Sequence, residues 1–310
     1  MNDDYELLVV GSANADLVVG VERRPAPGET VLGSDLAVHP GGKGGNQAVA
    51  AARLGARTAL LARVGDDAHG TLLLDAQRAA GVDTVGVLVG GAPTGVALIT
   101  VDPSGDNSIV VSPGANGRLT PEDIRAAGSL VSAARVVSTQ LEIPLETVAE
   151  VVRALRPGSR FVLNPSPPAP LPDEVLAACD PLVVNEHEAR VILGDDAGDS
   201  PEEWARGLLA LGPRSVVITL GAEGALAAEG SAGSAVRVPS PKVDAVDTTG
   251  AGDAFTAALG WRLGLGEDLP TAVAYAVRVG SAAVTRKGAQ DSYPTAAELA
   301  EAVPEEGPSR

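Results

Sequence analysis

Several residue types are scarce in this sequence, and each shortage narrows the chemistry that the chain can perform. Cys179 is the only cysteine among 310 residues, so an intramolecular disulfide is excluded and a cysteine-based metal site is not expected. The three histidines, His39, His69 and His187, do not fall at metal-ligand spacing. Aromatic residues make up only 2% of the chain, so Ala, Val and Leu must build the core and few rings can stack on bases.

Long apolar runs and positive charge are also lacking. No window reaches 18 consecutive apolar residues, so no membrane-spanning helix is predicted. The acidic start, MNDDYELLVVG, lacks the basic segment of a signal peptide, and we expect a cytoplasmic location. The formal net charge is −17, and so acidic a surface repels nucleic acids and anionic membranes. We therefore expect neither as a partner, and a polyanionic ligand must be held by local groups.

Two common phosphate-binding motifs are missing as well. GxxxxGK[ST] does not occur, because Lys43 is followed by Gly44, and GxGxxG does not occur either. If the chain binds a nucleotide, it must do so by another device.

What the chain has is a repeating order of short β-branched runs, glycine-rich turns and Ala/Leu-rich helical patterns. Buried strands are predicted at 7–10, 58–64, 136–139, 161–164, 182–184 and 215–219. Helices are predicted at 46–54, 70–80, 145–155, 186–193, 201–211, 253–263 and 271–284. This alternation favours a single α/β domain whose mainly parallel sheet is covered by helices on both faces.

Two segments break this order. Residues 17–38 and 93–112 alternate like half-exposed strands, and the second contains a hairpin-like turn, DPSGDN. They could form a small second sheet over the main domain or be ordinary edge strands, and the pattern alone leaves both open. Residues 303–310 are expected to form a frayed tail.

Polar side chains follow two of the predicted strands. Asn14 and Asp16 lie in GSANAD after the first strand, and Glu142 lies in QLEIP after another. Ligands of open α/β sheets bind at the carboxyl ends of the strands, so we expect these side chains to face one crevice. Asp16 could accept two hydrogen bonds from a vicinal diol. A turn-forming pair of Asx residues is the alternative.

A glycine-rich stretch, PGGKGGNQAVAAARLG, spans residues 40–55. Four glycines within five positions surround Lys43 and allow the backbone to approach a ligand closely. Asn46 and Gln47 then open a helix. The pattern favours a loop whose amides and Asn46 grip a polyhydroxylated ligand, and a flexible turn with an Asn cap is the alternative.

Two further strand ends have structural interpretations of equal or greater weight. In VVNEHEA, Asn185 followed by Glu188 resembles a helix cap with a capping box, which the residues alone favour. In ITLGAEGAL, Thr219 precedes the glycines Gly221 and Gly224, which would suit a plain hairpin or a ligand-binding turn.

The stretch VDTTGAGDAF, residues 246–255, carries the strongest signal. Gly250, Ala251 and Gly252 stand before Asp253 at the start of a helix, where backbone N–H groups and the positive helix end can hold an anion. Asp253 should stay ionised there, with an ordinary pKa of about 4, and could accept a proton beside the anion. Helix capping is the alternative, but capping alone does not require three small residues.

Taken together, these blocks resemble the ribokinase branch of the ribokinase-like (PfkB) carbohydrate kinases. The matching blocks are GSANAD, PGGKGGNQAVAA, RVGDDAHG, GVALITVD, QLEIPLE, NPSP, NEHEA, TLGAEG, VDTTGAGDAF and AVTRKGAQ. They extend from about residue 8 to about residue 295, and AVTRKGAQ favours this branch over adenosine or fructose kinases.

The resemblance implies a three-layer α/β/α domain with a small β-sheet lid, formed by 17–38 and 93–112, through which two copies form a homodimer. It implies ATP-dependent phosphorylation of the ribose 5-hydroxyl, with Asp253 as the base and an anion hole at Gly250, Ala251 and Gly252. The residues implied to hold the sugar are Asn14, Asp16, Gly42, Lys43, Asn46 and Glu142. Those implied to hold the nucleotide are Asn185, Thr219, Gly221, Gly224 and Gly252.

The resemblance also implies two metal ions. Asn185 and Glu188 match a motif that organises the water shell of Mg²⁺, which reverses the capping interpretation for Glu188. The residues implied to surround a monovalent cation, usually K⁺, are Asp247, Thr249, Ala283, Arg286, Gly288 and Ser292. One departure concerns adenine, because Val277 stands where many members carry an Asn.

Two alternatives to ribose phosphorylation remain open. One is a related kinase for deoxyribose, a nucleoside or another sugar. Asp16 bears on that choice, because a diol acceptor suits ribose better than 2-deoxyribose. The other is a non-catalytic sugar-binding protein, which would have no use for Asp253.

Overall fold

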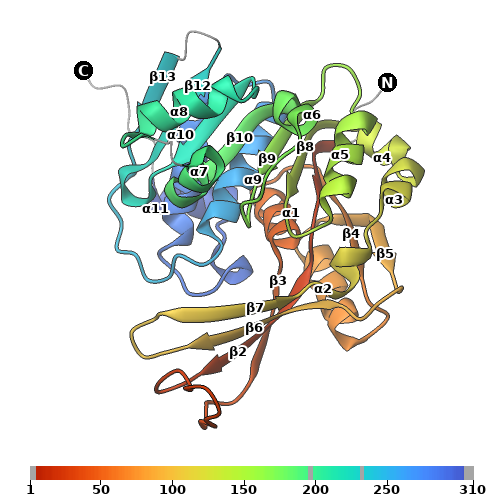
Figure 1. Ribbon diagram of the computed structural model, residues 1–310, viewed down its shortest axis with the longest axis vertical. Coiled ribbons are helices and arrows are strands. Elements are labelled where there is room, and N and C mark those ends of the chain that lie inside the picture. Colours follow the sequence, from red (N-terminus) through yellow and green to blue (C-terminus); the bar gives the residue numbers. More distant parts are fainter. Residues whose placement is uncertain (1–4, 195–197, 231–233, 304–310) are drawn as a thin grey trace.

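The computed structural model describes residues 5–194, 198–230 and 234–303, and a nine-stranded sheet forms the centre of its larger part (Figure 1). In spatial order the strands are β13 (Ser234–Val238), β12 (Ala225–Glu229), β11 (Ser215–Thr219), β10 (Cys179–Asn185), β9 (Arg160–Asn164), β8 (Ala134–Gln140), β1 (Tyr5–Val10), β4 (Thr58–Val64) and β5 (Asp83–Val89). The run from β11 to β5 is parallel, and β12 and β13 pair antiparallel at one edge.

Helices cover both faces of this sheet, as predicted. One layer contains α1 (Lys43–Arg53), α9 (Ala251–Gly264), α10 (Leu269–Ala283) and α11 (Ala296–Ala302), with α2 (Ala68–Ala79) beside α1. The other contains α3 (Pro121–Ala126), α4 (Gly128–Ser132), α5 (Leu145–Ala154), α6 (Asp173–Ala178), α7 (Glu186–Leu193) and α8 (Pro201–Ala210).

The apolar runs form central strands because the side chains on both faces of the sheet are buried in a hydrophobic core. Successive side chains of a strand point to opposite faces. In β1, Leu7 and Val9 enter the core under α1 and α9, while Leu8 and Val10 enter the core under α5. A strand with both faces buried needs a continuous apolar run, which explains why these strands were predictable.

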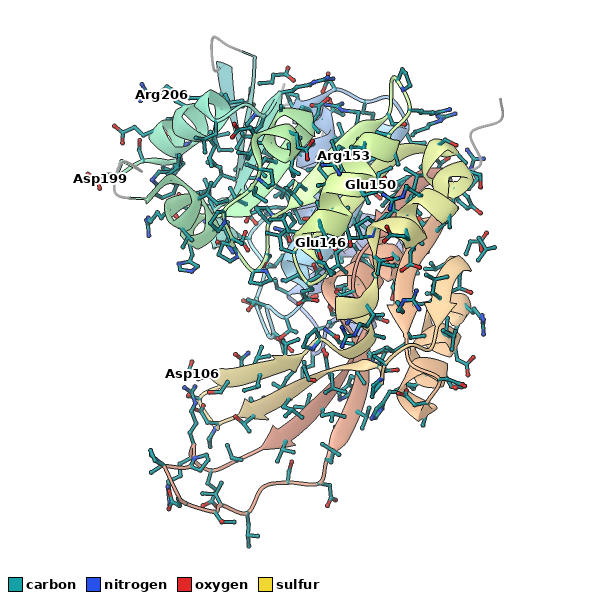
Figure 2. The ribbon with its side chains drawn as sticks, turned by 45° about the vertical axis from the view of Figure 1, so that its right-hand side comes forward. Asp106, Glu146, Glu150, Arg153, Asp199 and Arg206 are labelled. Carbon is teal, nitrogen blue, oxygen red and sulfur yellow. The ribbon has the colours of Figure 1, made fainter. Side chains whose placement is uncertain are left out.

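A separate four-stranded sheet is formed by the two segments that broke the alternating pattern. Its order is β3 (Ala37–Gly41), β2 (Asn14–Gly20), β6 (Gly95–Val101) and β7 (Asn107–Ser112), with β2 and β6 parallel. The predicted turn joins β6 to β7, where Gly105 N donates to the Asp102 carbonyl over 3.0 Å. This sheet projects from the main body, with Asp106 marking its hairpin (Figure 2). The edge-strand alternative is therefore wrong.

The predicted elements lie within three residues of the observed ones, but several elements escaped prediction. β5 is a partly exposed edge strand, and the alanine-rich sequence of β12, ALAAE, does not read as a strand. Of the expected frayed tail, Val303 is buried and 304–310 lie outside the described residues. Across the described ranges, no helix combines the length and apolarity that crossing a membrane requires.

The strand order predicts a crevice at the carboxyl ends of β1 and β8. From β1 the chain moves through α1 to β4 on one side, and from β8 it moves through α5 to β9 on the other. Such a switch point leaves the carboxyl ends of the two central strands uncovered, and ligands of open α/β sheets bind there.

Candidate active site

The ends of β1 and β8 bring their polar residues together around one carboxylate. Glu142 Oε2 accepts hydrogen bonds from Ser12 Oγ at 2.5 Å, Lys43 N at 3.1 Å and Asn14 Nδ2 at 3.5 Å. Asn116, next to β6, donates to Asn14 Oδ1 at 2.7 Å and so orients that amide. The predicted meeting of Asn14 and Glu142 is confirmed, and their roles as sugar ligands stay a prediction.

Asp16 approaches the same crevice from β2, which carries it in the second sheet. A Cβ on Gly41 would lie 2.2 Å from Asp16 Oδ2, so the glycine makes room for this carboxyl. Burial and the neighbouring carboxylates of Glu142 and Asp253 raise the pKa of Asp16 to about 7. Because Asn14 and Asp16 both lie within β2, the alternative of an Asx turn is wrong.

The glycine-rich stretch allows α1 to begin against the backbone that follows β1. The helix starts at Lys43 after Gly42, which has a φ of +82°, and a Cβ on Gly44 would lie 2.6 Å from Ser12 N. It therefore begins three residues before the predicted start, and Asn46 lies inside its first turns without capping it. The alternative of an Asn-capped turn is wrong.

Lys43 lies among acidic side chains. Burial alone would lower the pKa of its ammonium group, but the carboxylates of Asp253, Glu142 and Glu188 outweigh burial and raise it. The crevice thus has a fixed positive charge in a protein of strongly negative net charge.

Asp253 lies at the start of α9, where it faces α1. Gly250 precedes the helix with a φ of +74°, a left-handed conformation that favours glycine. Asp253 is 6% exposed, and its Oδ2 accepts from Asn46 Nδ2 at 3.0 Å while its Oδ1 accepts from Gln47 Nε2 at 3.3 Å. The carboxylate makes no capping hydrogen bond to α9, so the capping alternative is wrong.

The expectation of an ordinary pKa for Asp253 is also wrong. Burial raises the pKa, and the nearby charge of Lys43 and the hydrogen bonds from Asn46 and Gln47 offset only part of that effect. A helix dipole stabilises an anion by only about 0.3–2 kcal/mol, whereas removal of water from a carboxylate costs considerably more.

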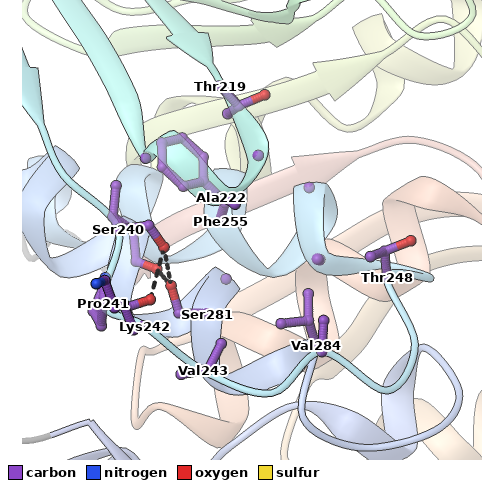
Figure 3. A pocket seen from close by; sticks show the side chains of 17 residues that line it. Thr219, Ala222, Ser240, Pro241, Lys242, Val243, Thr248, Phe255, Ser281 and Val284 are labelled. Atoms are coloured by element: carbon purple, nitrogen blue, oxygen red, sulfur yellow. Dashed lines mark hydrogen bonds between the residues drawn. The ribbon is translucent and has the colours of Figure 1, made fainter.

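An apolar pocket of about 440 Å³ lies beside Ala251 and Gly252, the residues before Asp253 (Figure 3). It is lined by Thr219, Gly221, Ala222, Gly224, Ser240, Pro241, Lys242, Val243, Ala245, Thr248, Ala251, Gly252, Phe255, Val277, Gly280, Ser281 and Val284. Four of the five residues implied to hold the nucleotide therefore line one pocket, together with Val277. The turn at 220–224 is also the predicted hairpin, since Thr219 pairs with Ala225.

A smaller cavity, of about 150 Å³, adjoins this pocket and is lined by Asp253. Thr219 and Gly252 line both cavities, and the smaller one is also lined by Asn185 and Glu188. The predicted capping box is confirmed, because Glu188 N donates to Asn185 Oδ1 at 2.8 Å and Asn185 N donates to Glu188 Oε2 at 2.9 Å. A buried carboxylate in such a cavity can also hold the water shell of a divalent cation.

The residues implied to surround a monovalent cation, several of them by backbone carbonyls, come from two loops and the end of α10. Asp247 accepts from Thr249 N at 2.9 Å and from Gly288 N at 2.8 Å, which ties the two loops to each other. Arg286 pairs with Glu298, Ser292 Oγ donates to the Ala289 carbonyl, and Ala283 is buried in α10. In the described part of the chain, no group of three or more His, Cys, Asp or Glu side chains could hold a metal.

Several buried amides beside Asp253 were not predicted as site residues from the sequence. Gln47 Oε1 accepts from Ser138 Oγ at 2.8 Å and from Gln140 Nε2 at 2.6 Å, and Gln290 Nε2 donates to Asn46 Oδ1 at 3.1 Å. A signal was present, because Ser138 and Gln140 are polar residues at the end of a strand predicted to be buried.

Comparisons with known proteins agree with this geometry. The model of the pfkB family carbohydrate kinases matches residues 4–296. The chain is 42% identical to a ribokinase of Bacillus subtilis, over 95% of this chain and 98% of that protein. It is 36% identical to a deoxyribokinase of Salmonella typhi, over 94% of this chain and 96% of that protein. A structure of Arabidopsis thaliana ribokinase complexed with ribose and ATP superposes with a TM-score of 0.89 at 33% identity, over 96% and 98%.

Proposed function

The chain belongs to the pfkB family of carbohydrate kinases, and on that premise we propose that it transfers the γ-phosphoryl group of ATP to the 5-hydroxyl of D-ribose. The similar protein solved with ribose and ATP supports this pair of substrates. The deoxyribokinase of similar identity makes 2-deoxyribose the second candidate acceptor.

One observation carries the proposal: Asp253 lies where the polar crevice meets the pocket. Its carboxylate bonds to Asn46 on the crevice side, and it lines the small cavity with Glu188 and Gly252 on the other. A base at this junction can meet the hydroxyl of one substrate and the phosphate of the other. A protein that only binds sugar does not need a buried carboxylate there.

The sugar is proposed to occupy the polar crevice. The groups assigned to it are Asn14, Asp16, Gly42, Lys43, Asn46 and Glu142. The hydrogen bonds that gather Asn14 and Lys43 around Glu142 support this assignment. Asp16 would take the 2,3-diol, because a carboxylate with two oxygens can accept from both hydroxyls.

Phosphoryl transfer then involves a single proton transfer, from the sugar hydroxyl to Asp253. The sugar O5 attacks the γ-phosphorus, and the bond between that phosphorus and the leaving oxygen of ADP breaks. Asp253 accepts the proton of the hydroxyl group. Because burial raises its pKa, Asp253 is a stronger base than an exposed carboxylate, while Lys43 favours its ionised form. The N–H groups of residues 250–252 face the charge on the transferring group. Positioning and charge stabilisation supply most of the rate in such a loose transition state.

The nucleotide is proposed to place its adenine in the apolar pocket and its phosphates towards Gly252. Val277 offers adenine an apolar wall in place of an amide. The buried carboxylate of Glu188 suits Mg²⁺ held through water, and a bound Mg²⁺ would neutralise phosphate charge. The loops tied together by Asp247 suit a monovalent cation ringed by carbonyl groups, which would hold the 250–252 turn in shape.

The four-stranded sheet is proposed to act as a lid and to pair with a second copy. Asp16 faces the crevice, so its neighbour Leu17 points away, and it is flanked by Val38 and Leu98, with Val110 beyond. Of this row, Val38, Leu98 and Val110 are 38%, 49% and 65% exposed. An apolar row of this kind favours burial against a like surface. A cytoplasmic location also stays a prediction.

A coupled assay of ADP release over a panel of pentoses, hexoses and nucleosides tests the proposal. Ribose should give the highest kcat/KM. A preference for 2-deoxyribose would assign the second candidate instead. If no sugar releases ADP although ribose binds in calorimetry, the chain is a sugar-binding protein and the kinase proposal is wrong.

A further inference from the structure

Two neighbouring residues of α1 hold Asp253, but they are not equivalent. Asn46 bonds to Oδ2 and Gln47 to Oδ1. Asn46 is 7% exposed and receives a second hydrogen bond from Gln290, whereas Gln47 is completely buried. Asn46 is therefore the more accessible of the two amides to a ligand.

Two side chains of β8 fix the orientation of the Gln47 amide. Ser138 Oγ and Gln140 Nε2 both donate to Gln47 Oε1, and all three side chains are completely buried. A carbonyl oxygen that accepts two hydrogen bonds leaves only the NH₂ group to face Asp253. Reversal of the amide would turn Gln47 Oε1 towards the ionised Asp253 carboxylate, which can only accept hydrogen bonds, so the observed orientation is the favoured one.

The backbone explains how the Gln47 side chain can contact both β8 and α9. The glycines before Gln47 let α1 lie against the chain that leaves β1, since a Cβ on Gly44 would meet Ser12 N at 2.6 Å. The same helix packs along α9, which carries Asp253, and against β8. Gln47 thus lies at the point where α1, β8 and α9 meet.

From this geometry we propose that Gln47 is a positioning residue, whose amide holds Oδ1 of Asp253 so that Oδ2 is directed at the substrate hydroxyl. The inference rests on the proposed function, because it takes Asp253 as the base. Proton transfer requires the base and the hydroxyl oxygen to lie about 2.6–3.2 Å apart, which a freely rotating carboxylate would seldom achieve. The amide also favours the ionised carboxylate, against the burial that raises the pKa of Asp253.

Gln47→Met tests this, because it keeps the length of the side chain and removes its donor. We expect kcat to fall roughly 10- to 100-fold, since a misplacement of about 1 Å can have that effect. The sugar dissociation constant, measured by calorimetry without nucleotide, should stay near the wild-type value. The acid limb of the pH profile of kcat should move to higher pH, and Gln47→Glu should move it further by adding a second carboxyl group.

Gln77→Met is the matched control. Gln77 lies in α2, is 1% exposed and donates to the Gly45 carbonyl of α1 at 3.2 Å rather than to Asp253 or Gln47. This variant should lose stability as Gln47→Met does, while its acid limb stays in place. A shift of equal size in both variants would assign the effect to the packing of α1 and overturn the proposal.

A second readout does not depend on activity. The pKa of the Asp253 carboxyl group, followed by carboxyl-carbon NMR in the free protein, should be higher in Gln47→Met than in the wild type, and an unchanged pKa with unchanged kcat overturns the inference. A wild type inactive on every sugar overturns the proposed function instead. If Gln47→Met does not fold, the same measurements are made on Ser138→Ala, which removes one of the two donors to the Gln47 amide.

Discussion

The polar crevice and the apolar pocket on the two sides of Asp253 differ in chemistry. They are called the polar half and the apolar half of the site. The half under the second sheet consists of partly buried charges and of amides, among them Asp16, Lys43 and Glu142, and Glu142 accepts hydrogen bonds from Ser12 and from the Lys43 backbone. The half beyond Asp253 is an apolar pocket with glycines, whose walls include Phe255 and Val277. On the proposed function, the first half recognises the sugar by side-chain hydrogen bonds, and the second recognises the nucleotide by shape and by backbone groups.

This difference has an energetic consequence. A buried polar group that loses its partner costs about 1–3 kcal/mol, so single substitutions in the polar half should be severe and specific. One methylene group more or less in an apolar pocket is worth about 1–3 kcal/mol, with little dependence on which contact is lost. The polar half should therefore set which sugar reacts, and the apolar half should set only how tightly the nucleotide binds.

Asp253→Asn should have the largest effect, because it removes the base where the two halves meet. We expect kcat to fall by about 10²- to 10⁴-fold, the usual contribution of general base catalysis. Sugar affinity should change little, since the neutral amide keeps the size of the side chain. Steady-state kinetics and calorimetry on the same preparation measure both. Near-normal turnover would rule out Asp253 as the base.

Asp16→Asn should show that the polar half selects the sugar. We expect kcat/KM for ribose to fall about 100-fold, because an amide cannot accept two diol hydrogen bonds as a carboxylate does. The value for 2-deoxyribose, which lacks one of these hydroxyls, should fall less. The ratio of the two kcat/KM values is the measurement. An equal loss for both sugars would mean that Asp16 does not contact the diol.

The same contrast explains what the sequence could predict. Buried strands are continuous apolar runs and helices have their own period, so the layers of the main sheet followed from local pattern. The strand-end rule then placed Asn14 and Glu142 in one crevice, although they lie far apart in the sequence. The apolar pocket did not follow from the pattern alone, because the turn at Gly224 suited a plain hairpin equally well, and only the family resemblance assigned this turn to a nucleotide.

Properties that depend on packing could not be predicted. Burial raises the pKa of Asp253, and no local pattern reports how much water the fold removes from one carboxylate. The partners of Gln47 come from β8, which lies about 90 residues further along the chain. The pairing of β2 with β6 likewise depends on long-range register, so the pattern of each segment left its sheet undecided.

A substitution in the apolar half should have a smaller and less specific effect. Val277→Phe narrows the pocket and should raise KM for ATP about 10-fold, within the 1–3 kcal/mol range of overpacked sites, while KM for the sugar stays unchanged. Val273→Phe is the matched control, because Val273 is buried in the same helix, one turn earlier, and does not line the pocket. A rise in the sugar KM as well would show that the halves are not separable.

The smallest effect concerns stability and distinguishes the halves without any substrate. The pKa of Asp16 is about 7 in the folded protein, against 3.8 for an unperturbed group, so the folded state keeps a proton that the unfolded state releases. Stability should therefore fall as pH rises from about 4 to about 7, and the penalty is complete above that range. Asp16→Asn removes this penalty.

We expect Asp16→Asn to raise Tm by about 2–5 °C at pH 8 and by clearly less at pH 5, because a few kcal/mol shift Tm by only a few degrees in a chain of this size. Scanning fluorimetry of the protein without ligands measures both values. Asp106→Asn is the control, since Asp106 lies exposed at the hairpin of the same sheet (Figure 2) and should change Tm equally at both pH values. A gain for Asp16→Asn that does not depend on pH would mean that its carboxyl group is not desolvated, and that the polar half holds its charges without strain.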